Sequence, residues 1–391
     1  MLENFLVILL VPILGILGVL FLILCINLLT FYRLRGVGRP TTTPASLSIL
    51  VPARNEEHCI ETCVLSLIAQ CYEPLEVLVL DDNSSDATAA IVQRLIDELP
   101  AAQKGRLRLL HGKTLPTGWI GKNFACHQLA QHAHGHYLLF TDADTIHAPE
   151  TAKAVIDCMH TLGVKLLTAQ PEHVVQGLGE RLVVPLLNFT ILTLLPVALI
   201  SRRAELSLAT GNGQLLCFQR SAYEAIGGHE AVKGRVLEDV LLARAVKAAG
   251  YRMIFVDALE LVRCRMYRSF ADVWAGFSKN LFAFYNYSLP FALIALLLNL
   301  LLFVMPPLIL LVSLLIPVQF PLLIGAASAS MLAVLMRICL TLRFTRSQRG
   351  LMLLLCLLHP VSILLECLIL LNSMRWYYGR TGIVWKGRRY L

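Results

Sequence analysis

Two long stretches of this 391-residue chain contain no charged side chain, one between Glu3 and Arg33 and the other between Lys279 and Arg337. A helix needs roughly 20 apolar residues to cross a bilayer. The first stretch therefore predicts one transmembrane helix, and the second predicts a hairpin of two. Prolines at positions 317 and 321 place the turn of the hairpin near those residues.

Two further apolar runs are interrupted or flanked by polar residues. The run 351–371 contains His359, Pro360 and Glu366, so it predicts either a third C-terminal span or a re-entrant segment, and both readings stay open. The run 182–200 lies between arginines on both sides. We expect it to lie against the membrane surface rather than to cross, which would bring the neighbouring domain to the lipid.

Between these regions, short apolar runs alternate with helical patterns. Such alternation predicts an α/β domain with a mainly parallel sheet covered by helices on both faces. The expected strands are 46–51, 75–80, 107–110, 137–140, 165–169 and 215–218, and the expected helices are 56–70, 86–99, 123–133, 149–161 and 240–249.

The composition supports a membrane protein, with 57% apolar and 15% charged residues, where a soluble domain has about 25% charged residues. The net charge of +8 is unevenly distributed. Arginines 33, 35 and 39 follow the first span, others flank the later spans, and residues 40–280 carry a slight excess of acid. This distribution argues against nucleic-acid binding. By the positive-inside rule it places 40–280 in the cytosol, behind an uncleaved anchor, in a multi-pass protein of the cytoplasmic membrane.

Polar clusters follow three of the expected strands, at 52–56, 81–86 and 142–144. In open parallel sheets, ligands bind beyond the carboxyl ends of the strands. Asp142 and Asp144 lie two residues apart at a strand end, where carboxylates can bind a divalent cation. The alternative is a turn with solvated or capping aspartates, and Asp86 or Ser85 could likewise simply cap the next helix.

Other candidate groups lie farther along the chain. Lys122 follows a glycine-bearing loop at the start of a helix, where it could meet a phosphate or be an ordinary exposed lysine. Glu238 and Asp239 begin another helix. They could complement the helix dipole, or one of them could be a carboxylate base at the mouth of a site.

Six of these segments together resemble membrane-bound family 2 glycosyltransferases with the GT-A fold, which is Rossmann-like. They are VPARNE at 51–56, VLVLDDNSSDAT at 77–88, GWIGKNFA at 118–125, FTDADT at 140–145, GNGQ at 211–214 and LEDVLLARAVKAAGYR at 237–252. The resemblance covers roughly 46–280. The membrane segments and the C-terminal WKGRRY most resemble the subgroup associated with hopanoid and carotenoid glycosylation.

The resemblance implies roles for individual residues. Asp239 corresponds to the catalytic base, and Asp144, with Asp142, corresponds to the ligands of Mg²⁺ or Mn²⁺. The residues implied at the nucleotide are Pro52, Ala53, Arg54, Glu56, Asp81, Asp82, Lys122 and Asp142. Gly211, Gly213 and Glu238 belong to the two motifs implied around the remaining substrate.

One departure from the family pattern concerns processive members, many of which carry QxxRW near residues 275–280. This chain has WAGFSKN at 274–280, and Lys279 could take the place of the missing arginine at the diphosphate. We therefore expect transfer of a single sugar, with inversion, from a nucleotide-sugar such as a UDP-sugar to a membrane lipid. A polysaccharide synthase and a non-enzymatic transporter are the alternatives.

The expected organisation has four parts. Residues 1–32 form the anchor, and 40–280 form the glycosyltransferase domain, which includes the interfacial segment 182–200. Residues 281–372 form the C-terminal membrane region, and 373–391 form a basic tail.

Overall fold

The computed structural model describes residues 2–35, 45–103, 105–379, 383–385 and 388–390. Arg39, Arg380 and Lys386, which contribute to the expected basic flanks, lie outside these ranges. The chain forms two compact units. One comprises Phe31–Val174 and Val197–Met266, and the other comprises Met1–Thr30, Val175–Pro196 and Tyr267–Leu391.

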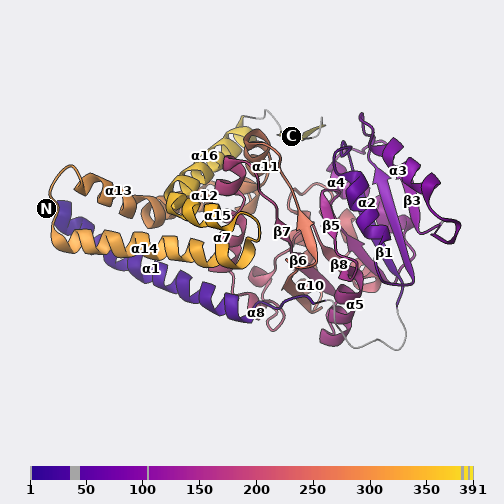
Figure 1. The fold of residues 1–391 in the computed structure, drawn as a ribbon, viewed down its shortest axis with the longest axis horizontal. Helices are drawn as coiled ribbons and strands as arrows, with labels where there is room; N and C mark the ends of the chain where they lie inside the picture. The colour runs from indigo at the N-terminus through magenta and orange to yellow at the C-terminus, as the bar shows by residue number, and fades with distance from the viewer. Residues whose placement is uncertain (1, 36–44, 104, 380–382, 386–387, 391) are drawn as a thin grey trace. The chain divides into compact units, whose positions relative to one another are not determined.

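The first unit is built on a seven-stranded sheet with the order β3-β2-β1-β4-β8-β6-β9 (Figure 1). Neighbouring strands are parallel except at β8, which runs antiparallel to both β4 and β6. This confirms the predicted α/β fold with a mostly parallel sheet. The strands are β1 (Leu47–Ala53), β2 (Leu75–Asp81), β3 (Leu107–His111), β4 (Tyr137–Phe140), β6 (Leu166–Gln170), β8 (Leu216–Gln219) and β9 (Met253–Asp257).

Helices cover both faces of this sheet because its central strands are apolar on both sides. Ile49 and Val51 of β1 belong to a buried cluster with α2 (Ile60–Ile68), α3 (Thr88–Glu98) and α5 (Thr151–Leu162). Helix α4 (Gly121–His132) packs on β1 and β2 without joining that cluster, so it covers the opposite face. Helices α9 (Arg220–Ala225) and α10 (Glu238–Ala248) complete this unit beside β8 and β9.

A second sheet of three strands, with the order β5-β10-β7, was not anticipated from the sequence. Its strands, β5 (Thr145–His147), β7 (Glu172–His173) and β10 (Val262–Cys264), have only two or three residues each. Hydrophobic alternation cannot be recognised over so few positions. This sheet begins directly after the Asp142–Asp144 turn and helps to fix where that turn lies.

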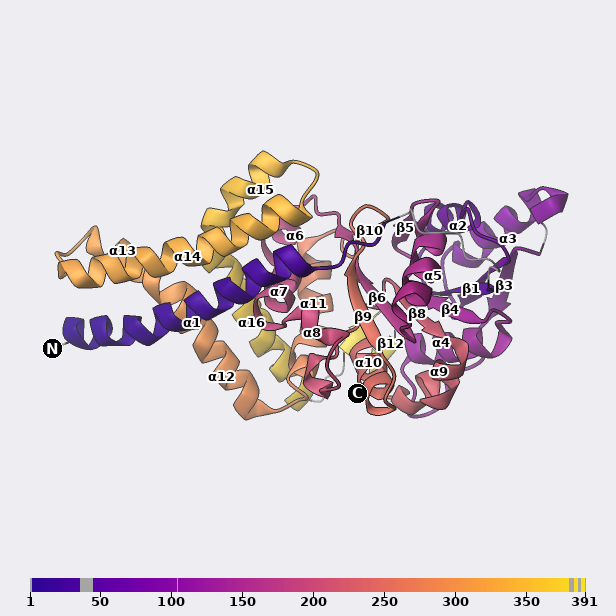
Figure 2. The same cartoon turned by 90° about the horizontal axis from the view of Figure 1, so that it is seen from below.

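The other unit contains four apolar helical stretches that are long enough to cross a membrane: Glu3–Thr30, Leu289–Ser313, Phe320–Phe344 and Arg349–Tyr378. They match, in number and place, the predicted anchor, the hairpin and the third C-terminal segment. Helices α1 (Leu2–Thr30) and α14 (Phe320–Phe344) lie side by side (Figure 2). The last stretch contains α15 (Arg349–Leu355) and α16 (His359–Tyr378). Its length suits a span, but the side on which the basic tail lies stays a prediction.

The apolar run 182–200 is broken into α6 (Leu178–Val183), α7 (Leu186–Leu194) and α8 (Val197–Ile200). Among the described residues, it is not one of the stretches long enough to span. Asn27 donates to the carbonyls of Leu192 and Leu195, each at 2.8 Å, and the buried Arg337 donates to the carbonyl of Leu182 at 3.1 Å. Polar side chains of α1 and α14 thus bind backbone carbonyls of α6 and of the C-terminal end of α7.

Gly135, before β4, provides a test of the packing in the first unit. Its N–H donates to Ser48 Oγ at 2.7 Å, and a Cβ at this position would lie 2.4 Å from the Ser48 nitrogen. We predict that Gly135→Ala lowers the free energy of unfolding by roughly 1–3 kcal/mol, because β1 would have to shift. Chemical denaturation of the detergent-solubilised protein measures this. Gly18→Ala, where a Cβ meets nothing within 4 Å, is the control. Equal unfolding midpoints for the two variants would contradict the packing described here.

Candidate active site

The predicted polar clusters converge at one edge of the main sheet. Strands β1, β2 and β4 are parallel neighbours, with Ala53 opposite Asp81 and Leu50 opposite Phe140. The segments that follow them are therefore adjacent, as the sequence predicted.

Arg54 binds the loop that follows β2. Its Nη1 donates to the carbonyls of Asp82 at 2.5 Å and Asn83 at 2.8 Å, and the Asp82 N–H donates to the Ala53 carbonyl at 2.8 Å. Asp81 and Asp82 are both buried. Their implied place at the nucleotide stays a prediction.

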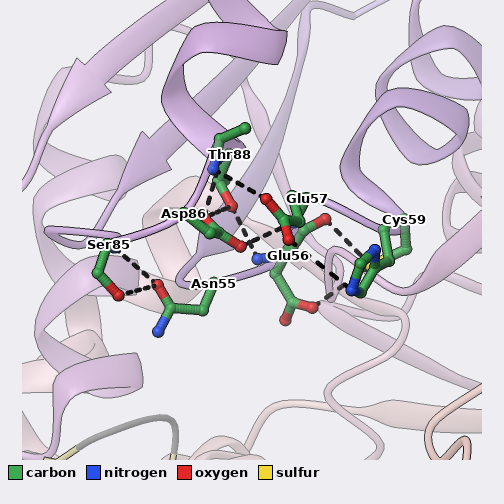
Figure 3. A network of polar contacts seen from close by, with 9 residues as sticks. Asn55, Glu56, Glu57, Cys59, Ser85, Asp86 and Thr88 are labelled. Carbon is green, nitrogen blue, oxygen red and sulfur yellow. Dashed lines mark hydrogen bonds and ion pairs between the residues drawn. The ribbon is translucent and has the colours of Figure 1, made fainter.

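The remaining residues of these two loops bind each other (Figure 3). Asn55 accepts from the Ser85 N–H at 2.8 Å, and the Glu56 N–H donates to Thr88 Oγ1 at 2.8 Å. Asp86 accepts from the Thr88 N–H at 3.0 Å and from the Glu57 N–H at 3.1 Å. Burial alone would raise the pKa of Asp86, but these hydrogen bonds outweigh it and lower the pKa. Asp86 therefore binds the N–H of Thr88, the first residue of α3, but the N-cap residue of this helix is Ala87.

A charge centre forms from Lys122, Asp142 and Glu238, which come from three motifs far apart in the chain. Lys122, in the first turn of α4, places Nζ 2.7 Å from Asp142 Oδ1 and 3.1 Å from Glu238 Oε1. Burial lowers the pKa of Lys122, but the two carboxylates outweigh burial and raise the pKa well above its usual value. A Cβ on Gly213 would lie 2.7 Å from Lys122 Nζ, so a larger residue there would displace the ammonium group.

Asp239 is held by the glycine-rich segment 211–214. Its Oδ2 accepts from the Gly213 N–H at 3.1 Å, and its Oδ1 accepts from the Val240 N–H at 2.8 Å. A Cβ on Gly211 would meet the Asp239 backbone at 2.4 Å. Burial, reinforced by the charge of Glu238, raises the pKa of Asp239 to about 7, although Lys122 acts in the opposite direction. A carboxyl group with this pKa can take up and release a proton near neutral pH.

The Asp142–Asp144 turn has the features of a cation site. Thr145 holds the turn by donating from N–H and from Oγ1 to the Asp142 carbonyl. Burial and the nearby charge of Asp142 raise the pKa of Asp144 to about 6. Asp144 Oδ1 is buried without a hydrogen-bond partner, which suits a metal ligand.

A metal ion would need further ligands at this turn. Across the residues that the structure describes, no group of three or more His, Cys, Asp or Glu side chains is placed to hold a metal. The two aspartates therefore fit an Mg²⁺ or Mn²⁺ ion that takes its remaining oxygen ligands from water and phosphate.

A small pocket of about 10 Å³, roughly the room for one water, opens beside the charge centre. Its wall includes Pro52, Lys122, Asp142, Gly213, Glu238 and His229. The first five belong to the predicted site. Sequence reasoning assigned no role to His229, and only its place in the Gly227-Gly228-His229-Glu230 turn was visible. Lys279, the remaining candidate, lies on α11 (Phe270–Phe284) in the other unit, and its role stays a prediction.

The chain is similar to known glycosyltransferases in sequence and in fold. Residues 48–212 match the Glycosyl transferase family 2. The 4,4'-diaponeurosporenoate glycosyltransferase of Staphylococcus aureus is 28% identical over 247 residues, which are 60% of each chain. The enzyme of the same name from Staphylococcus haemolyticus is 28% identical over 62% of this chain and 63% of its own. The match thus spans less than two thirds of these relatives.

A solved structure shares the fold along nearly the whole chain. The mannosyltransferase PcManGT from Pyrobaculum calidifontis, determined with GDP-Man and Mn²⁺, superposes with a TM-score of 0.58 and covers 97% of this chain and 100% of its own, at 18% identity. At that identity the similarity establishes the GT-A fold alone.

Lys122 provides a test of the charge centre. We predict that Lys122→Met lowers the free energy of unfolding by roughly 1–2 kcal/mol, because Asp142 and Glu238 lose their shared counter-ion. The effect is below that of a fully buried pair because solvent reaches part of the Lys122 side chain. Denaturant titration measures it, with the exposed Lys113→Met as the matched control. Identical stability of the two variants would contradict the role of Lys122.

Proposed function

We propose that this chain, whose residues 48–212 form a family 2 glycosyl transferase domain, is an inverting glycosyltransferase that moves one sugar from a nucleotide-sugar to a membrane lipid. The observation that carries the proposal is the half-buried Asp239 carboxylate, held by Gly213 beside Lys122 and the Asp142–Asp144 turn. The site thereby combines a group that can accept a proton near neutral pH with groups suited to a diphosphate and its cation.

The donor side of the site would use Lys122 and the two aspartates of the turn. Asp142 and Asp144 would hold a divalent cation, which neutralises the charge of the leaving diphosphate when bound. Lys122 is already held by two carboxylates, so its charge is positioned before any substrate arrives. The Mn²⁺ in the PcManGT complex supports a divalent cation for this chain.

The acceptor side would use Asp239 as a general base. Its carboxylate would take the proton from an acceptor hydroxyl group as that oxygen attacks the anomeric carbon. The bond between the anomeric carbon and the diphosphate breaks in the same displacement, so the configuration inverts. Glu238 lines the pocket beside this base and would orient the substrate.

A membrane lipid is the acceptor that best fits the rest of the chain. Four apolar stretches long enough to cross a membrane accompany a catalytic domain of ordinary charge. Such anchoring is useful where one substrate stays in the bilayer. The similarity to 4,4'-diaponeurosporenoate glycosyltransferases supports an isoprenoid-type lipid, and the distribution of arginines supports a domain on the cytosolic side of the cytoplasmic membrane.

Asp239 is the most direct test of the mechanism. We predict that Asp239→Asn reduces sugar transfer by at least about 100-fold while the affinity for the nucleoside diphosphate stays within twofold, because the amide cannot accept the proton. Transfer is measured as labelled sugar moved from nucleotide-sugars into the chloroform-soluble fraction of a membrane lipid extract.

The wild-type enzyme should also show a pH dependence set by Asp239. With a pKa of about 7, the carboxylate is protonated and inactive at lower pH. Transfer should therefore rise with pH, reach half its maximum near pH 7, and fall about tenfold for each unit well below it. Full activity of Asp239→Asn would refute the base assignment.

Asp144 tests the cation site. We predict that Asp144→Ala weakens the binding of Mn²⁺ by at least about tenfold, because a buried, unpartnered carboxylate oxygen is lost. Calorimetric titration with Mn²⁺ in the presence of nucleoside diphosphate measures this. Asp157→Ala, which removes a carboxylate paired with Lys153 on α5, is the control. Unchanged Mn²⁺ affinity in Asp144→Ala would contradict the assignment.

A further inference from the structure

The residue after Lys122 is an asparagine that the proposed mechanism does not use. Asn123 belongs to the GWIGKNFA motif, lies in the first turn of α4 and is 0% exposed. A buried side-chain amide destabilises the fold unless it is hydrogen-bonded, and a leucine of similar size would avoid that loss. An amide at this position therefore indicates specific hydrogen-bond partners.

The partners are three backbone carbonyls of one short segment, 232–235. Nδ2 of the asparagine donates to the carbonyls of Val232 at 2.9 Å, Lys233 at 3.2 Å and Arg235 at 2.9 Å. Carbonyl oxygens only accept hydrogen bonds, so the amide must face them with its NH₂ group. The Ile120 N–H, just before α4, donates to the Lys233 carbonyl as well, at 2.8 Å.

The segment 232–235 also packs closely against the loop that precedes α4. A Cβ on Gly234 would lie 3.1 Å from the carbonyl oxygen of Gly118. Gly118 itself has a φ of +82°, which favours glycine. The hydrogen bonds of Asn123 and this close approach together hold 232–235 against the GWIGKNFA motif.

The same segment leads directly into the proposed catalytic motif. Two residues separate 232–235 from Glu238 and Asp239. Lys122, the neighbour of Asn123 in α4, binds Glu238 with 3.1 Å between Nζ and Oε1. Consecutive residues of one helical turn thus bind both ends of this stretch, Asn123 through neutral hydrogen bonds and Lys122 through an ion pair.

These two contacts determine where the proposed base lies relative to the donor side of the site. Lys122 belongs to the donor side, whereas Asp239 acts on the acceptor. With the hydrogen bonds to 232–235 removed, the stretch that carries Asp239 would be held at one end only. Small displacements matter here, because misplacing a reacting group by about 1 Å can slow a reaction about 100-fold.

We propose that Asn123 is a positioning residue for sugar transfer. By holding 232–235 against the first turn of α4, it fixes where Asp239 meets the acceptor oxygen. Because Asn123 is fully buried, it acts through this segment and not by touching a substrate. The inference rests on the proposed function, since it takes Asp239 to be the base.

The test separates the rate of transfer from the binding of the donor. We predict that Asn123→Ala lowers kcat about 10- to 100-fold and leaves the KM of the nucleotide-sugar and the Kd of its nucleoside diphosphate within about twofold, because only the base is displaced. The full-length protein in detergent is assayed with Mn²⁺ and membrane lipid extract. The donor is whichever of UDP-glucose, UDP-galactose, UDP-N-acetylglucosamine and GDP-mannose the wild-type protein uses, and UDP or GDP serves in calorimetry.

Gln128→Ala is the matched control. Gln128 lies on the same helix, is 3% exposed and accepts from the Lys113 N–H at 2.9 Å, so this variant also removes a buried amide of α4. We expect a similar fall in the unfolding temperature but a change in kcat of less than about threefold. Hydrogen exchange gives a readout that does not depend on transfer: the amides of 236–241 should exchange faster in Asn123→Ala and not in Gln128→Ala.

Equal losses of kcat in the two variants, or a loss confined to donor affinity, would overturn the assignment of Asn123. If Asn123→Ala does not fold, Asn123→Ser decides the matter by the same comparison, and an unchanged kcat would count against the assignment. A wild-type protein that transfers none of these sugars would instead overturn the proposed function, and exchange in 236–241 would still show whether Asn123 holds that stretch.

Discussion

The position of one ammonium group organises this site. Lys122 Nζ lies between carboxylates that come from two distant parts of the chain, Asp142 after β4 and Glu238 at the start of α10. Without that cation, two acidic motifs would repel each other in a partly buried space. Gly213 leaves the room that the lysine needs, and its N–H binds the adjacent Asp239.

The charge centre also explains why acids of similar chemistry can take different roles. Asp142 and Glu238 each contact Lys122 directly, whereas Asp239 and Asp144 are half-buried and form no ion pair within the described part of the chain. Burial raises the pKa of these last two toward neutrality, to about 7 and about 6. One such carboxyl group suits proton transfer, and the other suits a divalent cation, which favours the ionised form. Carboxyl groups at one edge of the sheet can thus serve different functions because their surroundings differ.

Much of this arrangement could be predicted from the sequence, because apolar strands and the polar residues at their ends follow local rules. The strand at 137–140 was predicted to the residue, and the parallel order brings the loops after β1, β2 and β4 together. The antiparallel direction of β8 and the small sheet β5-β10-β7 depend on tertiary pairing, which the hydrophobic pattern does not contain.

The details of the site were less accessible to sequence reasoning. The contact between Lys122 and Glu238 joins residues far apart in the chain, so no local pattern indicates it. The hydrogen bond between the Tyr223 hydroxyl and the His229 ring depends on the close approach of the backbone at Gly228 to Tyr223. Packing and burial, rather than residue type alone, decide which of the polar groups are structural and which face the pocket.

The central claim is that this chain attaches a sugar to a membrane lipid, and lipid extracts test it most directly. Cells that contain the wild-type protein, cells that lack it and cells that carry Asp239→Asn can be compared by mass spectrometry of total lipids. The account predicts a glycolipid that is present only with the wild-type protein, together with accumulation of the unglycosylated lipid in the other two. Indistinguishable lipid profiles in all three would contradict it.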